Sequence, residues 1–203
     1  MISTIVTVAF TAAYYAVAIY MVRGIKLKTR DLSLCGIVIA MTVVLESIFI
    51  TLPTGANIAL LSPVPLFLLA ILVDGRLAII SGWICGALVM LTVPEWRLVH
   101  WGQFFVEHMV CLSCLGFASV FGTDKRWKIL CGIALASAIK IIGHTLSGVL
   151  FFSQNAPTGW GAWFYSLVYN LSQNIPLCAL SAIVVLAIPL NSLRRAILKE
   201  NKA

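Results

Sequence analysis

Long apolar runs constrain this chain most, because they leave too few charged residues to cover a water-soluble fold. Of its 203 residues, 61% are hydrophobic and only 10% are charged, whereas a soluble domain carries about a quarter charged residues. A helix that spans a bilayer needs about 20 mostly apolar residues. Seven segments meet or approach that length: residues 2–22, 33–52, 57–73, 77–94, 99–121, 127–152 and 161–190. The sequence therefore predicts an all-α, polytopic integral membrane helix bundle.

The first apolar segment has two interpretations, a signal peptide or a transmembrane helix. A signal peptide starts with basic residues and ends at a small-residue cleavage site. This segment has no basic residue before Arg23, and "YYAVAIYMVRG" offers no such site. We therefore expect residues 1–24 to form an additional transmembrane helix and residues 25–203 to form a six-helix membrane domain. Because the first helix carries no charged side chain, we expect its deletion to leave ligand binding largely intact.

The basic residues predict how the chain is oriented. Twelve of the 14 lysines and arginines follow the first, third, fifth and seventh apolar segments, so they fall on one side of the membrane. These residues are Arg23, Lys26, Lys28, Arg30, Arg76, Lys125, Arg126, Lys128, Arg194, Arg195, Lys199 and Lys202. By the positive-inside rule, the amino terminus lies outside and the carboxyl terminus in the cytoplasm. This topology accounts for the net charge of +7, so we expect no nucleic-acid partner.

The six cysteines all fall within predicted helices: Cys35, Cys85, Cys111, Cys114, Cys131 and Cys178. Cys111 and Cys114 form a C-x-x-C pair, but no second pair or histidine cluster follows at the spacing of a zinc site. We interpret the cysteines as small apolar core residues. The sequence therefore predicts neither a metal nor a cofactor.

Ionisable and amide side chains inside the apolar segments are candidates for function, because burying a charge in hydrocarbon is costly. Six polar groups in the last three segments are expected in the outer half of the bilayer: Glu107, His108, Lys140, His144, Tyr165 and Asn170. Lys140 and His144 share a helix face at i,i+4 spacing. We expect this set to converge on one outward-opening pocket. The alternative is that Glu107 and Lys140 merely neutralise each other.

Other polar and aromatic residues have more ordinary interpretations. Glu46, near the outer end of its segment, is expected to reach the interface or line a cap. Tryptophans favour the membrane interface, so an aromatic belt and a structured cap are equal alternatives for Trp96, Trp101, Trp160 and Trp163. A flat heteroaromatic ligand would stack on rings, for which Phe152, Tyr165, His144 and either Trp160 or Trp163 are candidates.

The stretch "KIIGHTLSGVLFFSQNAPTGWGAWFYSLVYN", residues 140–170, resembles the signature region of the thiamine-specific substrate-binding (S) subunits of energy-coupling factor transporters. "QFFVEH", residues 103–108, resembles an earlier element of that family, and the resemblance spans about residues 32–190. It implies a bacterial cell-membrane protein that captures thiamine or a related pyrimidine/thiazole compound at the outer face. It also implies the pocket residues, which are Glu107, Lys140, His144, Gly148, Tyr165 and Asn170.

The chain departs from this family at three pocket positions. Family members often carry tryptophan where this chain has Phe152 and Ala56, and tyrosine where it has His108. Tryptophan is the best partner for a cationic ring, and its loss weakens binding by about 1 kcal/mol per contact. We include His108 and Phe152 among the expected binding residues. These departures leave open thiamine, its hydroxymethylpyrimidine moiety or another vitamin-like heterocycle as the ligand.

The resemblance also implies partners: a transmembrane coupling subunit and two cytoplasmic ATPases. This sequence contains no G-x-x-x-x-G-K-[ST] motif, so ATP hydrolysis is expected in those partners. In the family, small residues on the first core helix form the docking face, which here implies Gly36 and Ala40. Gly82 and Gly86 have the same spacing, and we expect them to pack helices within the bundle.

Two other classes of function are weighed against transport. An intramembrane enzyme would use His108, His144, Glu107 or a cysteine, but the sequence contains neither H-E-x-x-H nor G-x-S-x-G. A purely structural membrane subunit would leave Glu107, Lys140 and His144 without a role. The sequence therefore favours a substrate-binding subunit that is not itself an enzyme.

Overall fold

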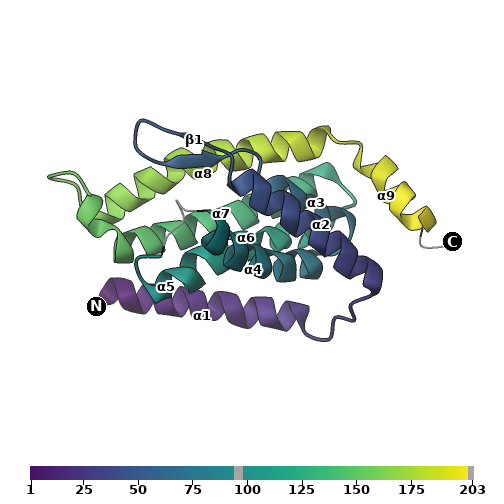
Figure 1. Ribbon diagram of the computed structural model, residues 1–203, viewed down its shortest axis with the longest axis horizontal. Coiled ribbons are helices and arrows are strands. Elements are labelled where there is room, and N and C mark those ends of the chain that lie inside the picture. Colours follow the sequence, from purple (N-terminus) through teal and green to yellow (C-terminus); the bar gives the residue numbers. More distant parts are fainter. Residues whose placement is uncertain (94–97, 201–203) are drawn as a thin grey trace.

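The computed structural model describes residues 1–93 and 98–200, with side chains described as far as residue 197. It is a bundle of helices with one small hairpin (Figure 1). The longer helices are α1 (Ile2–Val22), α2 (Thr29–Glu46), α3 (Pro63–Leu72), α4 (Gly75–Thr92), α7 (Arg126–Phe151), α8 (Ala162–Ala187) and α9 (Leu190–Glu200). The expected positions of Trp96 and Arg97 fall outside the described residues.

Within the described part of the chain, four helices are long and apolar enough to cross a membrane, namely α1, α4, α7 and α8. The second, third and fifth expected spans do not form single long apolar helices. α2 has 18 residues but includes Arg30, Asp31 and Glu46, and α3 has only 10 residues. The fifth expected span consists of α5 (Trp101–Gln103), a π-helix η2 (Phe104–Met109), α6 (Val110–Ser113) and a 3₁₀-helix η3 (Cys114–Ser119). The fold is the expected polytopic helix bundle, with more irregular backbone than expected.

A β-hairpin replaces the ends of two expected helices. Strands β1 (Phe49–Thr51) and β2 (Asn57–Ala59) pair antiparallel, with Ile50 opposite Ile58. The turn between them contains Gly55 at φ 81°, a conformation that glycine adopts without steric cost. The expected spans 33–52 and 57–73 were therefore too long, because a short apolar run has no periodicity that separates a strand from a helix.

The last expected span, 161–190, is a single helix that ends slightly earlier than expected. Ile188 has φ −68° and ψ 140°, which is the extended conformation that a following proline imposes, here Pro189. α8 therefore ends at Ala187, and a separate helix α9 begins at Leu190. The Arg194 guanidinium donates to the carbonyl oxygens of Ile71 (3.3 Å) and Thr123 (3.1 Å), which ties α9 to the end of α3.

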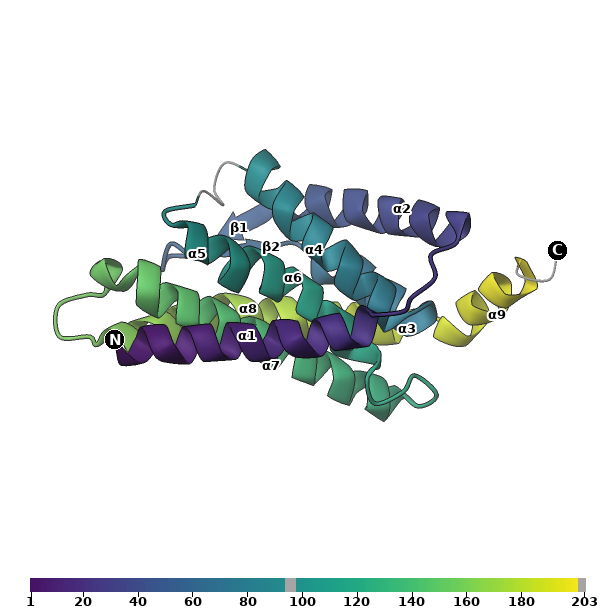
Figure 2. The same cartoon turned by 90° about the horizontal axis from the view of Figure 1, so that it is seen from below.

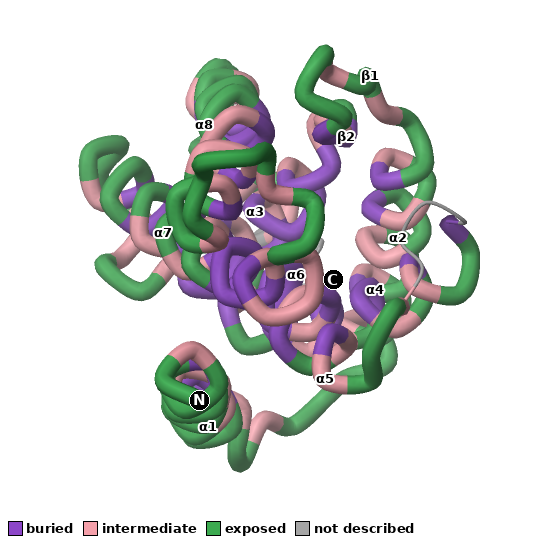
Figure 3. The backbone as a smooth tube through the Cα atoms, turned by 90° about the vertical axis from the view of Figure 1, so that its left-hand side faces the viewer, coloured by how far each residue is buried: buried purple, intermediate pink, exposed green. Residues whose placement is uncertain are grey.

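The two ends of the bundle hold different connecting segments. The amino terminus, the hairpin and the α7–α8 connection lie at one end, whereas the α1–α2 connection and α9 lie at the other (Figures 1 and 2). The basic residues that follow α1 and precede α7 share this second end with those of α9. Figure 3 shows that α6 lies in the buried centre, while α1 is exposed along most of its length.

Glycines allow α4 to contact the irregular segment closely. A Cβ at Gly82 would lie 2.6 Å from the carbonyl oxygen of Leu112, and one at Gly86 would lie 2.8 Å from the carbonyl carbon of His108. The expectation that these two glycines pack helices inside the bundle is confirmed. Five of the six cysteines are buried, as expected for core residues, whereas Cys131 is exposed.

Gly82→Ala is expected to lower the free energy of unfolding by about 1–3 kcal/mol, because the new methyl group would overlap backbone atoms that cannot rotate away. Gly36→Ala is the matched control, since a Cβ there meets nothing within 4 Å. The measurement is the thermal unfolding midpoint of each detergent-purified variant. Equal midpoints for the two variants would contradict the close packing of α4.

Candidate functional site

Two adjoining cavities lie between the hairpin, the irregular segment, α7 and α8. The wide cavity has a volume of about 230 Å³, and its lining includes Gln103, Gly148, Phe152, Tyr165, Tyr169 and Asn170. The narrow cavity has a volume of about 30 Å³, and its lining includes Glu46, His108, Cys111, Lys140, Asn174 and Leu177. Both are also lined by Asn57, Glu107, His144 and Gln173. The shared lining makes them one continuous site.

The structure brings all eight residues expected in the pocket to these two cavities. Glu107 and His144 line both. Gly148, Phe152, Tyr165 and Asn170 line the wide cavity alone, and His108 and Lys140 line the narrow one. Their role in binding remains a prediction.

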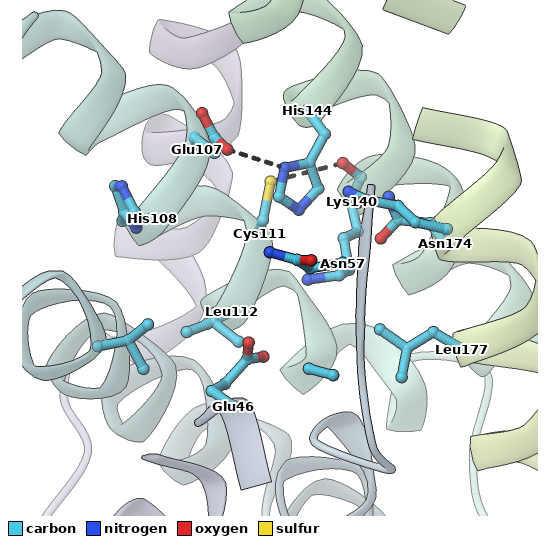
Figure 4. A pocket seen from close by; sticks show the side chains of 13 residues that line it. Glu46, Asn57, Glu107, His108, Cys111, Leu112, Lys140, His144, Asn174 and Leu177 are labelled. Carbon is cyan, nitrogen blue, oxygen red and sulfur yellow. Dashed lines mark hydrogen bonds and ion pairs between the residues drawn. The ribbon is translucent and has the colours of Figure 1, made fainter. Parts of the chain in front are cut away.

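Glu107 is the centre of the hydrogen-bond network. Its Oε2 accepts from Gln103 Nε2 at 3.0 Å and from Ser147 Oγ at 2.6 Å. Its Oε1 lies 3.4 Å from His144 Nδ1, and Figure 4 shows these two side chains pointing toward one another. A buried carboxylate must be paired or hydrogen-bonded. Two donors therefore fix Oε2, while Oε1 faces His144.

The alternative in which Glu107 and Lys140 neutralise each other is wrong. The partners of Glu107 are Gln103, Ser147 and His144. Lys140 is 5% exposed, yet its ammonium group makes no ion pair within the part of the chain that the structure describes. Lys140 thus brings a buried positive charge to the narrow cavity rather than cancelling the charge of Glu107.

The π-helix sets the position of Glu107 and His108. π-helices are rare and often occur at functional sites, and this one lies between α5 and α6 where a regular helix was expected. One turn earlier, Gln103 is 3% exposed, and its Oε1 accepts from the backbone N–H of Val99 at 3.0 Å. Gln103 therefore connects the carboxylate of Glu107 to the start of this helical segment.

Close packing of α7 against α8 forms the far wall of the wide cavity. A Cβ at Gly148 would lie 3.1 Å from Ser166 Cβ. Ser166 Oγ donates to the carbonyl of Thr145 at 2.7 Å, and Asn170 Nδ2 donates to the carbonyl of Ser166 at 2.8 Å. The absent side chain of Gly148 therefore lets α8 bring Asn170 close to α7, where it lines the wide cavity together with His144.

The hairpin supplies a wall that sequence reasoning missed. Asn57 lines both cavities and accepts a hydrogen bond from Thr51 Oγ1 at 2.8 Å. Tyr169 donates its hydroxyl to the carbonyl of Gly55 at 3.2 Å, and its ring lies 5.8 Å from that of Tyr165. The position of Asn57 depends on strand pairing, for which the apolar run gave no signal.

The positions of Gln173 and Tyr169 in the sequence could have pointed to the site. They lie within three residues of Asn170 on α8, and Gln173 Nε2 is 3.4 Å from Asn170 Oδ1. Amides one turn apart in an apolar helix mark a polar face, and that signal could have added Gln173 to the predicted site.

The expectation that Glu46 reaches the membrane interface is wrong. Its side chain is 6% exposed and lines the narrow cavity, where Figure 4 shows it across from His144 and Lys140. α2 ends at Glu46, and the chain then turns into the hairpin beside the site. The carboxylate therefore faces the interior rather than the membrane interface.

Among the described residues, the tryptophans do not supply ring faces to the site. Trp101, Trp160 and Trp163 are 76%, 43% and 47% exposed, and none of them lines either cavity. Trp163 instead lines an apolar groove with Phe164 and Leu167 on the outside of α7 and α8. The expected contribution of Trp160 or Trp163 to ligand stacking is therefore wrong.

Gly36 and Ala40 lie away from the site, on the exposed face of α2. A Cβ at Gly36 would meet nothing within 4 Å. This face is therefore open to another helix, as a docking surface requires.

In comparisons with known proteins, residues 32–197 match the model of a family described as thiamine transporter protein (Thia_YuaJ). The thiamine transporter ThiT of Bacillus subtilis (strain 168) is 24% identical over 172 residues, which is 79% of this chain and 88% of that protein. The structure of ThiT from Listeria monocytogenes superposes with a TM-score of 0.72 at 24% identity, covering 81% of this chain and 96% of that one. The fold is therefore shared, and α1 precedes the matched region.

Proposed function

Since the chain belongs to the thiamine transporter protein family, and is thus a multi-pass membrane transport protein rather than an enzyme, we propose that it is the substrate-binding S component of an energy-coupling factor importer. It captures thiamine or a closely related pyrimidine/thiazole compound and delivers it inward with a separate coupling module. The observation that carries this proposal is the buried Glu107 carboxylate, whose Oε1 faces His144 at the junction of the two cavities.

The chemistry of the site suits this ligand class. Thiamine joins a cationic thiazolium ring to an aminopyrimidine, so it requires a negative charge, hydrogen-bonding groups and flat faces. Glu107 supplies the charge, Asn170 and Gln173 supply amides, and Tyr165 and Phe152 supply rings. Among these, Glu107 is the group that distinguishes a cationic ligand from a neutral one.

The distribution of basic residues supports an outward-facing site. The positive-inside rule places α9 and the α1–α2 connection in the cytoplasm, so the amino terminus lies outside. The hairpin shares the end of the bundle that holds the amino terminus (Figure 1). The wide cavity therefore opens outside the cell, in the bacterial plasma membrane.

Energy for import comes from partners in this proposal. The sequence lacks a phosphate-binding ATPase motif, so a transmembrane coupling subunit and two cytoplasmic ATPases supply hydrolysis. The docking face is the exposed side of α2 at Gly36 and Ala40, where small residues permit close helix contact.

A different vitamin-like heterocycle is the second candidate ligand. Phe152 gives the wide cavity a smaller ring face than tryptophan would, whereas Ala56 is fully buried in the hairpin turn and lines neither cavity. A smaller stacking face favours a ligand that depends less on cation–π contact.

Copurification separates the two candidate ligands. Protein purified from cells is denatured, and the released compounds are identified by mass spectrometry. Thiamine or its pyrimidine moiety supports the proposal, and a different vitamin overturns its substrate.

Phe152→Trp is expected to strengthen thiamine binding by about 1 kcal/mol, because the indole gives a larger face to a cationic ring. Phe151→Trp is the matched control, since Phe151 stacks on His100 at 5.1 Å, outside both cavities. The measurement is the calorimetric affinity of each variant for thiamine. An equal gain in both variants would show that the effect does not arise in the wide cavity.

A further inference from the structure

We propose that α1 is a positioning element of the binding site, in which Tyr14 and Tyr15 hold the π-helix that carries Glu107. This inference rests on the proposed function, because it assigns Glu107 to the ligand. It replaces the expectation that the first helix takes no part in binding. α1 precedes the residues that match the family model, which begin at residue 32, so the family resemblance assigns it no role.

Tyr15 contacts the start of the π-helix. Its hydroxyl donates to the carbonyl oxygen of Phe105 at 3.1 Å, and its ring stacks on Trp83 of α4 at 6.4 Å. Within a membrane, every backbone polar group needs a partner inside the protein. Tyr15 therefore gives the Phe105 carbonyl a side-chain donor where the irregular backbone passes close to lipid.

Tyr14 contacts the end of the same segment through Ser113. The Ser113 hydroxyl donates to the carbonyl of Met109, the last residue of the π-helix. That hydroxyl has only one hydrogen, so the Tyr14 hydroxyl is the donor in its own contact with Ser113 Oγ. Tyr14 is 6% exposed, and its ring lies 5.9 Å from Phe117. Tyr15 thus contacts the six-residue π-helix near its start, and Tyr14 reaches its last residue indirectly, through the Ser113 hydroxyl of α6.

Other helices enclose the remaining sides of the segment. A Cβ at Gly86 of α4 would lie 2.8 Å from the carbonyl carbon of His108, and one at Gly143 of α7 would lie 3.2 Å from the carbonyl oxygen of Val106. The π-helix is therefore held between α1, α4 and α7. Without α1, the π-helix loses the direct Tyr15 contact and the indirect one through Ser113, and the backbone that carries Glu107 is less firmly held.

The test compares wild type with Tyr14→Phe/Tyr15→Phe, which removes both hydroxyls and keeps both rings. Tyr20→Phe is the matched control, because Tyr20 lies on the same helix, is 64% exposed and contacts Arg23. We expect about a three- to tenfold loss of thiamine affinity in the double variant, on the scale of one or two hydrogen bonds. Tyr20→Phe is expected to bind as wild type does.

The same substitutions in a Glu107→Gln background separate positioning from general destabilisation. If the tyrosines act through Glu107, they cause little further loss of affinity once its charge is gone. Should the double variant not fold, Tyr15→Phe alone replaces it, since Tyr15 is only half-buried. Unchanged affinity, or an equal loss in both backgrounds, would overturn the inference.

Hydrogen exchange tests the inference without any ligand. Amides of residues 104–113 are expected to exchange faster in the tyrosine variant than in wild type or Tyr20→Phe, because their backbone loses its contacts with α1. If wild type does not bind thiamine, the proposed function fails, and this exchange result alone decides the role of α1. Unchanged exchange in residues 104–113 would refute that role.

Discussion

Glu107→Gln is expected to weaken thiamine binding by about 2–4 kcal/mol, which is the cost of removing one partner from a desolvated charge contact. The substitution keeps the shape of the side chain and removes its charge. Gln103 and Ser147 fix one carboxylate oxygen, and the other, which faces His144, is the oxygen that we propose meets a cationic ring or an amino group. A neutral pyrimidine fragment is expected to lose less, because an amide still exchanges a hydrogen bond.

Affinities for both ligands are measured by calorimetry, together with the unfolding midpoint of the ligand-free protein. Glu46→Gln is the comparison variant, because Glu46 is a buried carboxylate that lines the narrow cavity alone. It is expected to cost less thiamine affinity than Glu107→Gln. A large fall in ligand-free stability with equal losses for the charged and neutral ligands would mean that Glu107 serves the fold and not the ligand.

Ala40→Trp is expected to abolish uptake in cells while the isolated subunit still binds its ligand. Ala40 lies on the exposed face of α2 and lines neither cavity. An indole on that face would keep a partner helix from the close approach that small residues allow. Vitamin uptake by cells that carry the coupling subunits, together with calorimetry of the purified variant, measures the two effects separately.

Ala138→Trp is the matched control for this substitution. Ala138 is an exposed alanine on α7, 12 residues from the start of that helix, as Ala40 is 11 residues from the start of α2. Normal uptake by the control and none by Ala40→Trp would support docking on α2. If Ala40→Trp imports normally, another surface contacts the coupling subunit.

The sequence predicted the residues on regular helices best. Lys140 and His144 lie at i and i+4 on α7, and that spacing alone places them on one face, whereas Gly148 was expected from the family resemblance. The spacing of Gly82 and Gly86 likewise predicted their packing inside the bundle, and the bundle itself followed from the apolar runs.

Residues placed by irregular backbone were harder to predict. Asn57 reaches the site through a hairpin whose short strands have the same apolar pattern as a helix end. Glu46 turns inward because α2 stops there, and no local signal marked that end as interior. The contacts of Tyr14 and Tyr15 depend on how α1 docks, which is a tertiary property.

The most direct test of the central claim is a calorimetric titration of the detergent-purified wild-type protein with thiamine, hydroxymethylpyrimidine and a panel of other B vitamins. The account predicts saturable one-to-one binding of thiamine or its pyrimidine moiety, competitive between the two, since both occupy the cavities around Glu107. No binding of either compound, or tighter binding of an unrelated vitamin, would contradict it.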